Sequence, residues 1–144
     1  MISLIAPGLA ALAAAWIGLL AAGPYLPSVV AGPLYLFAAF ICHQIADRSF
    51  HLDGAQLPVC ARCFGIYGGA ALGAVFATSS RCVRGSDPRT VALLVAGSIP
   101  TALTLGLEWA GLWTASNAIR AAAGSALGVA LAMIVVRATT LDYD

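Results

Sequence analysis

Charged residues are scarce in this sequence, and lysine is absent. Only 9% of the 144 residues are charged, 61% are hydrophobic, and the mean hydropathy is +0.94. Because a soluble domain carries roughly 25% charged residues, this composition excludes an ordinary soluble fold. It indicates an integral membrane protein whose main partner is the lipid bilayer. The net charge of +1 also argues against a nucleic-acid partner, which would require a basic stripe.

The N-terminal part of the sequence contains no charge before Asp47. A secretory signal would place basic residues ahead of a short apolar core, and no basic residue precedes the first apolar segment of this sequence. We therefore expect the first hydrophobic segment to be a retained membrane span.

Charge-free runs of about 20 residues predict transmembrane helices, and none of them alternates as the strands of a membrane barrel would. The five hydrophobic segments cover approximately Leu4–Ala22, Val29–Ile45, Phe64–Ser79, Val91–Leu107 and Ile119–Val136. The second segment is short and is interrupted early by Gly32-Pro33, so it is either a short separate pass or a kinked continuation of the first. We predict an all-α polytopic bundle over residues 1–144, a single integral membrane domain with four full spans and one short or kinked segment.

Glycines recur at every fourth residue in two of these segments. Gly65, Gly69 and Gly73 lie in the third segment, and Gly124 and Gly128 lie in the fifth. Such spacing lets the backbones of two membrane helices approach closely and pack by dispersion. We expect these glycines to be packing residues.

The distribution of arginines predicts the orientation in the membrane. The loop Arg81–Arg89 carries three arginines, and Arg137 follows the last segment. The positive-inside rule makes this side cytoplasmic. The loops 43–62 and 108–117 then face the extracytoplasmic side of what we expect to be a prokaryotic cytoplasmic membrane.

The loop 42–63, between the second and third segments, concentrates the soft ligands of the chain. It contains Cys42-His43-Gln44 at its start, His51 in its middle and Cys60-Ala61-Arg62-Cys63 at its end, and therefore three of the four cysteines and both histidines. In an otherwise apolar sequence this concentration indicates either a metal site or a redox-active thiol site.

Metal binding is the interpretation we favour. The spacing Cys60-x-x-Cys63 allows two thiolates to reach one ion, Cys42 supplies a third, and structural zinc sites use four Cys and His ligands. The fourth ligand is His43 or His51, and His43 can share an ion with its neighbour Cys42 only if the helix has ended there. We therefore predict a divalent metal ion, most plausibly zinc, held at one membrane surface, with a role in metal handling. Transport by so short a chain would call for a homo-oligomer.

Thiol redox chemistry is the alternative. Arg62 lies between the two cysteines of the pair, and a nearby cation favours the thiolate form. In an oxidising extracytoplasmic compartment the pair would form a disulfide, as in a membrane thiol-disulfide oxidoreductase linked to quinone, with Cys42 as resolving thiol. A plain structural disulfide is the third interpretation. Cys82 is excluded from the site because it follows Cys63 by 19 residues, about 28 Å along a helix.

Polar residues of the loop 108–117 are expected beside the cysteines. Glu108, Asn117 and Arg120 border this loop, which the predicted topology places at the same membrane surface. Ionisable groups near the membrane are costly and usually pair or serve function. We predict a Glu108–Arg120 ion pair that either closes the helix hairpin or contributes to the site.

The residues also resemble a family of small prokaryotic predicted membrane proteins of unknown function. The resemblance covers about residues 35–130 and is carried by the motifs Cys42-His43-Gln44, Arg48-Ser49-Phe50, Gly54, Pro58 to Cys63, Gly65-Ile66-Tyr67, Ser116-Asn117 and Arg120. It implies the membrane class. It also implies a family signature made of Cys42, His43, Gln44, Arg48, Cys60, Arg62, Cys63, Asn117 and Arg120. It favours His43 over His51 as a ligand, and Glu108 stands where the family would have Asp. No established reaction comes with it, so no catalytic residue is assigned.

Overall fold

A computed structural model describes residues 2–79 and 88–141 of the chain. Cys82 and most of the arginine-rich loop lie outside the described residues. Within the described residues the α-helices are α1 (Ile2–Ala22), α2 (Ser28–Ile41), α3 (Ala61–Ser79), α4 (Pro88–Trp109) and α5 (Asn117–Leu141). Two short 3-10 helices, Gly23–Tyr25 and Ala46–Arg48, and a two-stranded sheet complete the fold. The predicted mainly helical architecture is confirmed among these residues.

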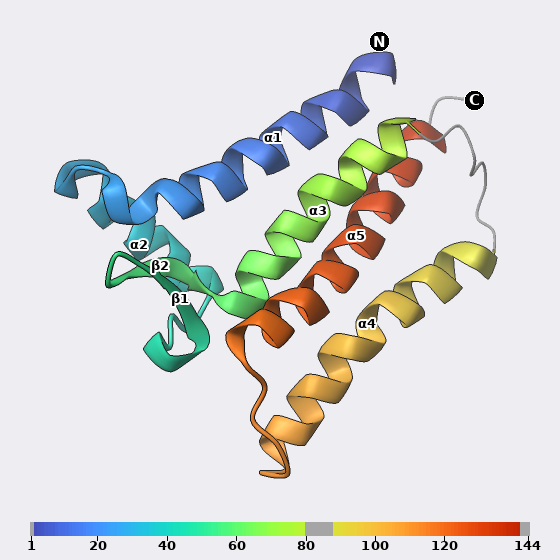
Figure 1. Cartoon of the computed structure of the whole chain (residues 1–144). Helices are drawn as coiled ribbons and strands as arrows, with labels where there is room; N and C mark the ends of the chain where they lie inside the picture. The colour runs from blue at the N-terminus through green and yellow to red at the C-terminus, as the bar shows by residue number, and fades with distance from the viewer. Residues whose placement is uncertain (1, 80–87, 142–144) are drawn as a thin grey trace.

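Helices α3 and α5 form the tightest pair in the bundle and run parallel, side by side (Figure 1). A Cβ placed on Gly65 or Gly69 would lie under 3.0 Å from the backbone of Ala121 or Ser125, and one on Gly124 would meet the backbone of Arg62. Because backbone meets backbone at these positions, no larger residue fits without moving a helix. The predicted packing role of the glycines is confirmed.

The other long helices run antiparallel to this pair. Ala10 of α1 packs with Ala74 of α3, while Trp16, further along α1, contacts Tyr67 with ring centroids 6.1 Å apart. Helix α4 descends along α5 in the same opposed sense. The end of α4 and the starts of α3 and α5 therefore meet at one end of the molecule, as the predicted topology requires.

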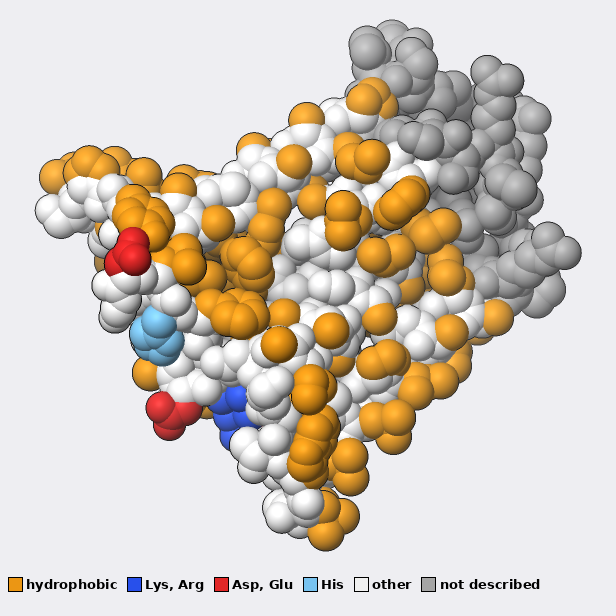
Figure 2. Space-filling model, viewed as in Figure 1, with side chains coloured by type: hydrophobic (Ala, Val, Ile, Leu, Met, Phe, Trp, Pro, Cys, Tyr) orange, Lys and Arg blue, Asp and Glu red, His pale blue; other side chains and the backbone are white. Residues whose placement is uncertain are grey.

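Apolar side chains cover the outside of the helices. On α4, Val91, Val95, Ile99 and Leu103 recur every fourth residue, and 65%, 53%, 48% and 59% of their surfaces are exposed. Figure 2 shows hydrophobic side chains spread over the helices, whereas the charged and histidine side chains visible on this face gather near the sheet. This arrangement suits a protein whose helices face lipid.

Three of the described helices are long and apolar enough to cross a membrane: Pro7–Tyr25, Val91–Trp109 and Asn117–Val136. Ser28–Ile41 and Ala61–Ala77 are apolar but shorter. The 14 residues of α2 extend about 21 Å at 1.5 Å per residue, less than a hydrocarbon core of about 30 Å. The second hydrophobic segment is therefore a separate helix that is short, as predicted. The total of four full spans stays a prediction.

The loop 42–63 forms a β-hairpin, which the all-α prediction did not include. It contains β1 (Ser49–Leu52) and β2 (Ala55–Cys60), which pair antiparallel. Asp53 and Gly54 join them with φ angles of 50° and 81°, as the two central residues of a type I′ turn require. The hairpin holds Cys60 in place at the start of α3.

Replacing Gly69 with alanine should destabilise the protein by about 1–3 kcal/mol, because the added methyl group overpacks a backbone contact. Gly68→Ala is the matched control, since nothing lies within 4 Å of a Cβ built there, and it should change stability by less than about 1 kcal/mol. Unfolding in detergent micelles measures both variants. Equal stability of the two would contradict the close α3–α5 contact.

Candidate functional site

Three cysteine side chains meet where α2, the hairpin and α3 come together. The Sγ atoms of Cys42, Cys60 and Cys63 all lie within 4.8 Å of one another, and all three are free thiols. Cys42 follows the last residue of α2, Cys60 ends β2, and Cys63 lies in the first turn of α3. The structure thus brings together the three cysteines that the sequence analysis selected.

Cys42 is held by both its backbone and its sulfur. Its backbone is extended (φ −149°, ψ 139°), which ends α2, while its N–H still donates to the Ala38 carbonyl at 2.9 Å. Its Sγ accepts hydrogen bonds from the backbone N–H of Cys60 at 3.2 Å and of Gln44 at 3.5 Å. Because the side chain is buried against Leu20 and Val59, the sulfur has a defined position.

Gln44 ties the end of α2 to the hairpin. It adopts a positive φ of 50°, and its Nε2 donates to the carbonyl oxygens of Tyr35 at 2.9 Å and Pro58 at 2.7 Å. The Gln56 side chain donates back to the Gln44 carbonyl at 2.7 Å. These bonds fix the distance between Cys42 and Cys60, so Gln44 positions the cluster from outside it.

The Cys60 thiol is more acidic than an ordinary cysteine. Hydrogen bonds from the side chains of Cys63 and, to a smaller extent, Cys42 lower the pKa of Cys60 to about 5 against the opposing effect of burial. Its place immediately before the N-terminus of α3 also favours a thiolate. At neutral pH one of the three sulfurs is therefore already in the form that binds metals or attacks disulfides.

A network of buried charges lies beside the cysteines. Glu108 Oε1 accepts from Arg120 Nε at 2.8 Å, and its Oε2 lies 3.4 Å from Arg62 Nη2. Only 3% of the Glu108 side chain is exposed, and the Ala115 N–H also donates to it at 3.3 Å. The predicted Glu108–Arg120 pair is confirmed, and Arg62 extends it to α3.

Two further polar residues complete this network. Arg120 Nη1 donates to Asn117 Oδ1 at 2.9 Å, and Asn117 Nδ2 donates to the Ser49 carbonyl at 2.9 Å. Arg62 Nη2 also donates to Thr104 Oγ1 at 3.2 Å, while Arg62 Nε is buried without a hydrogen-bond partner among the described residues. The network therefore connects α3, α4, α5 and the hairpin.

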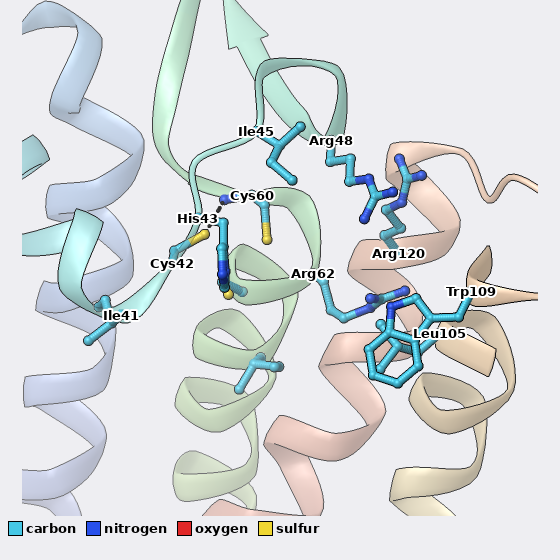
Figure 3. Close-up of a pocket in the computed structure, with 12 residues that line it drawn as sticks. Ile41, Cys42, His43, Ile45, Arg48, Cys60, Arg62, Leu105, Trp109 and Arg120 are labelled. Atoms are coloured by element: carbon cyan, nitrogen blue, oxygen red, sulfur yellow. Dashed lines mark hydrogen bonds between the residues drawn. The ribbon is translucent and has the colours of Figure 1, made fainter.

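The cysteines and the arginines line one cavity of about 420 Å³. Figure 3 shows Cys42 and Cys60 on one side and the side chains of Arg48, Arg62 and Arg120 converging on the other. Apolar residues form the remaining wall, with Ile66, Leu105 and Trp109 among them. Thiols and guanidinium groups thus share a single space at one end of the bundle.

The two histidines are placed differently. The helix does end before His43, as a shared ion would require, and His43 lines the cavity. Its ring nitrogens are nevertheless not part of the group of three sulfurs. His51 is exposed on β1 opposite Gln56 and does not line the cavity.

The sequence analysis missed Gln56, Ser49 and Thr104. The sequence signal for Thr104 was its position four residues before Glu108. Residues four apart share a helix face, so Thr104 could have been predicted to lie beside the Glu108 network. The positions of Gln56 and Ser49 at the site follow from the hairpin. Its sequence signal was the pair Asp53-Gly54 between two strand-forming runs.

These features define a small helical membrane protein with a cysteine cluster and a buried Arg–Glu–Arg network at one end of its bundle. Residues 42–134 match the family model described as "Predicted membrane protein (DUF2085)". The chain belongs to this family of predicted membrane proteins of unknown function, which confirms the resemblance seen in the sequence.

Two relatives are also uncharacterized proteins. One, from Methanothermobacter thermautotrophicus, is 32% identical over 95 residues, which is 66% of this chain and 84% of the relative. The other, MJ1492 from Methanocaldococcus jannaschii, is 50% identical over 42 residues, which is 29% of this chain and 27% of the relative. No solved structure matches the chain.

Glu108→Ala should destabilise the protein by about 3–5 kcal/mol, because it leaves Arg62 and Arg120 buried without their shared carboxylate. Asp53→Asn removes the charge of an exposed carboxylate that accepts a hydrogen bond from the Tyr25 hydroxyl and keeps a residue that tolerates the positive φ of this turn, so it should change stability by no more than about 0.5 kcal/mol. Glu108→Asp, which keeps the charge, should fall between them. Thermal unfolding in detergent tests the series, and a wild-type-like Glu108→Ala protein would refute the buried network.

Proposed function

We propose that this protein binds a zinc-like divalent ion through Cys42, Cys60 and Cys63 at one surface of the membrane. The observation that carries this proposal is the convergence of three Sγ atoms within 4.8 Å from three separate elements. A tetrahedral Zn–S₃ site with bonds of about 2.3 Å separates its sulfurs by about 3.8 Å, so a small inward movement of the side chains is sufficient.

The surroundings of the sulfurs support a metal. Backbone N–H groups that donate to Cys42 Sγ are the kind of outer contact that orients a ligand and moderates its charge. Three thiolates and one divalent ion carry a net charge of −1, and Arg62 lies between two of the ligating positions. The cluster can therefore hold an ion without leaving an isolated charge in an apolar region.

His43 is our candidate for the fourth ligand. It follows Cys42 directly and lines the same cavity as the three cysteines, so its imidazole would complete the Cys/His set of a zinc site. Catalytic and transport sites commonly leave one position to water or substrate. A labile His43 bond would suit a role in metal handling.

The orientation in the membrane is inferred from the distribution of arginines in the sequence. We infer that the cysteine end faces the extracytoplasmic side of a prokaryotic membrane, because the positive-inside rule assigns the side that carries the loop 81–89 and Arg137 in the predicted topology to the cytoplasm. If the role is transport, five helices leave little room for a gated path within one chain, and a homo-oligomer would form it.

A thiol-disulfide oxidoreductase is the second candidate, favoured by the position of Cys60 and Cys63 at the N-terminus of α3. Helix N-termini stabilise the thiolate of such pairs. The two candidates predict different states of the purified protein. In the oxidoreductase, Cys60 and Cys63 would be recovered as a disulfide with Cys42 free, and no metal would be bound.

Purified protein should contain about one equivalent of metal by elemental analysis, because three thiolates form one site. Its thiols should react slowly until a chelator is added. Cys42→Ser, Cys60→Ser and Cys63→Ser should each lower the metal content at least about tenfold, the loss expected when a thiolate ligand is removed.

Cys82→Ser is the matched control and should retain full metal content. Metal-free protein with a Cys60–Cys63 disulfide would refute the metal site in favour of the oxidoreductase. Loss of metal in Cys82→Ser would show that the cluster is not the three-cysteine site proposed.

Substitution of each histidine tests which of the two is the fourth ligand. His43→Ala should weaken zinc affinity by at least about tenfold, because it removes a direct ligand and even the loss of an outer contact costs about 10–100-fold, whereas His51→Ala should leave the affinity unchanged. Competition with a chromophoric chelator gives both affinities. An effect of His51→Ala alone would reverse the assignment.

A further inference from the structure

Three arginines line the cavity opposite the cysteines, and none of them is a ligand of the proposed metal site. Arg48 comes from the 3-10 helix before the hairpin, Arg62 from α3 and Arg120 from α5. In Figure 3 their side chains approach one another from different elements. Three cations on one wall repel each other, so this placement demands an explanation.

The protein supplies only part of the compensating negative charge. Glu108 is the carboxylate that pairs with these arginines among the described residues, and it is shared between Arg62 and Arg120. Three guanidinium groups against one carboxylate leave two positive charges at the cavity wall. This wall thus keeps a surplus of positive charge, with Arg62 and Arg120 largely buried and Arg48 exposed.

Hydrogen-bond donors also remain unused. Within the described part of the chain, the Arg48 guanidinium has no side-chain hydrogen bond or ion pair, and its backbone alone is bonded. Arg62 bonds only through Nη2, and at 3.4 Å its contact with Glu108 is long. Arg120 uses Nε and Nη1, which leaves Nη2 for another acceptor.

Apolar side chains form another part of the cavity wall. Ile66, Leu105 and Trp109 lie on its wall, and Trp109 ends a helix long enough to span the membrane. The starts of α3 and α5 are both near, and their partial positive charges reinforce the arginines. A ligand with an anionic head and an apolar body matches a cavity of this kind.

We propose that this cavity binds a phosphate group through Arg48 and the free donors of Arg62 and Arg120. The planar fork of arginine matches phosphate oxygens, and several arginines together favour a ligand with three acceptor oxygens. The phosphate belongs either to an anionic phospholipid headgroup or to a soluble phosphate compound. This site goes beyond the metal site and does not depend on it.

Two probes distinguish the sources: dioctanoyl phosphatidylglycerol and inorganic phosphate, each titrated into detergent-solubilised protein at constant ionic strength. Binding is followed by thermal shift and by native mass spectrometry. Binding of the lipid alone identifies a headgroup, and binding of both probes identifies a site open to free phosphate.

Arg48→Gln removes the exposed, unpaired arginine and leaves the Glu108 network intact. It should weaken binding of the effective probe by about tenfold, the effect of losing one charge-assisted hydrogen bond. Arg137→Gln, on α5 but at the end away from Arg120, is the matched control and should bind like the wild type. Chelator-treated protein should keep the phosphate affinity, which separates this result from any failure of the metal site.

The proposal is overturned if neither probe binds. It is also overturned if Arg48→Gln and Arg137→Gln weaken binding equally, because the effect would then reflect net charge alone.

Discussion

The close backbone contact between α3 and α5 is the constraint on which the rest of this molecule depends. The glycines along both helices allow it, and the contact at Gly124 is made to the backbone of Arg62 itself. Because the two helices are parallel, both of their N-termini reach the same end of the bundle. The contact therefore brings Arg62, between the two cysteines of the pair, beside Arg120 on the neighbouring helix. A wider helix separation would move these two guanidinium groups apart and leave Glu108 unable to reach both.

The buried carboxylate is the second requirement, and it follows from the first. Two arginines brought together at low dielectric repel each other, and a third element must neutralise them. Helix α4 provides Glu108, whose two oxygens face Arg120 and Arg62 separately. The turn after α4 adds the Ala115 N–H. This arrangement explains why α4, which packs mainly against α5 and has a largely exposed apolar surface, is held in register at the site.

The sequence predicts these features to different degrees, for physical reasons. The membrane class follows from composition, and the packing of Gly65 and Gly69 from their spacing, because both depend on local regularities. The three-cysteine cluster followed from the predicted topology, which brings separate chain segments to one surface. The hairpin was not predicted because its two strands are short and lie in a polar segment between two apolar ones. The pair Asp53-Gly54 nevertheless marked its turn. The exclusion of His43 from the sulfur group depends on side-chain rotation, which no sequence pattern encodes.

The opposite charges within one cavity suggest why thiols and arginines occur together. A cluster of three thiolates with a divalent ion is anionic, while the facing wall carries an excess of positive charge after Glu108 is counted. Each side lowers the electrostatic cost of the other across a space of about 420 Å³, where burial strengthens both interactions. Direct neutralisation would need contact between guanidinium and thiolate, yet the side-chain hydrogen bonds of Arg62 and Arg120 go to oxygens rather than sulfurs. The space between the two walls is therefore a place where a bound anion would meet the arginines.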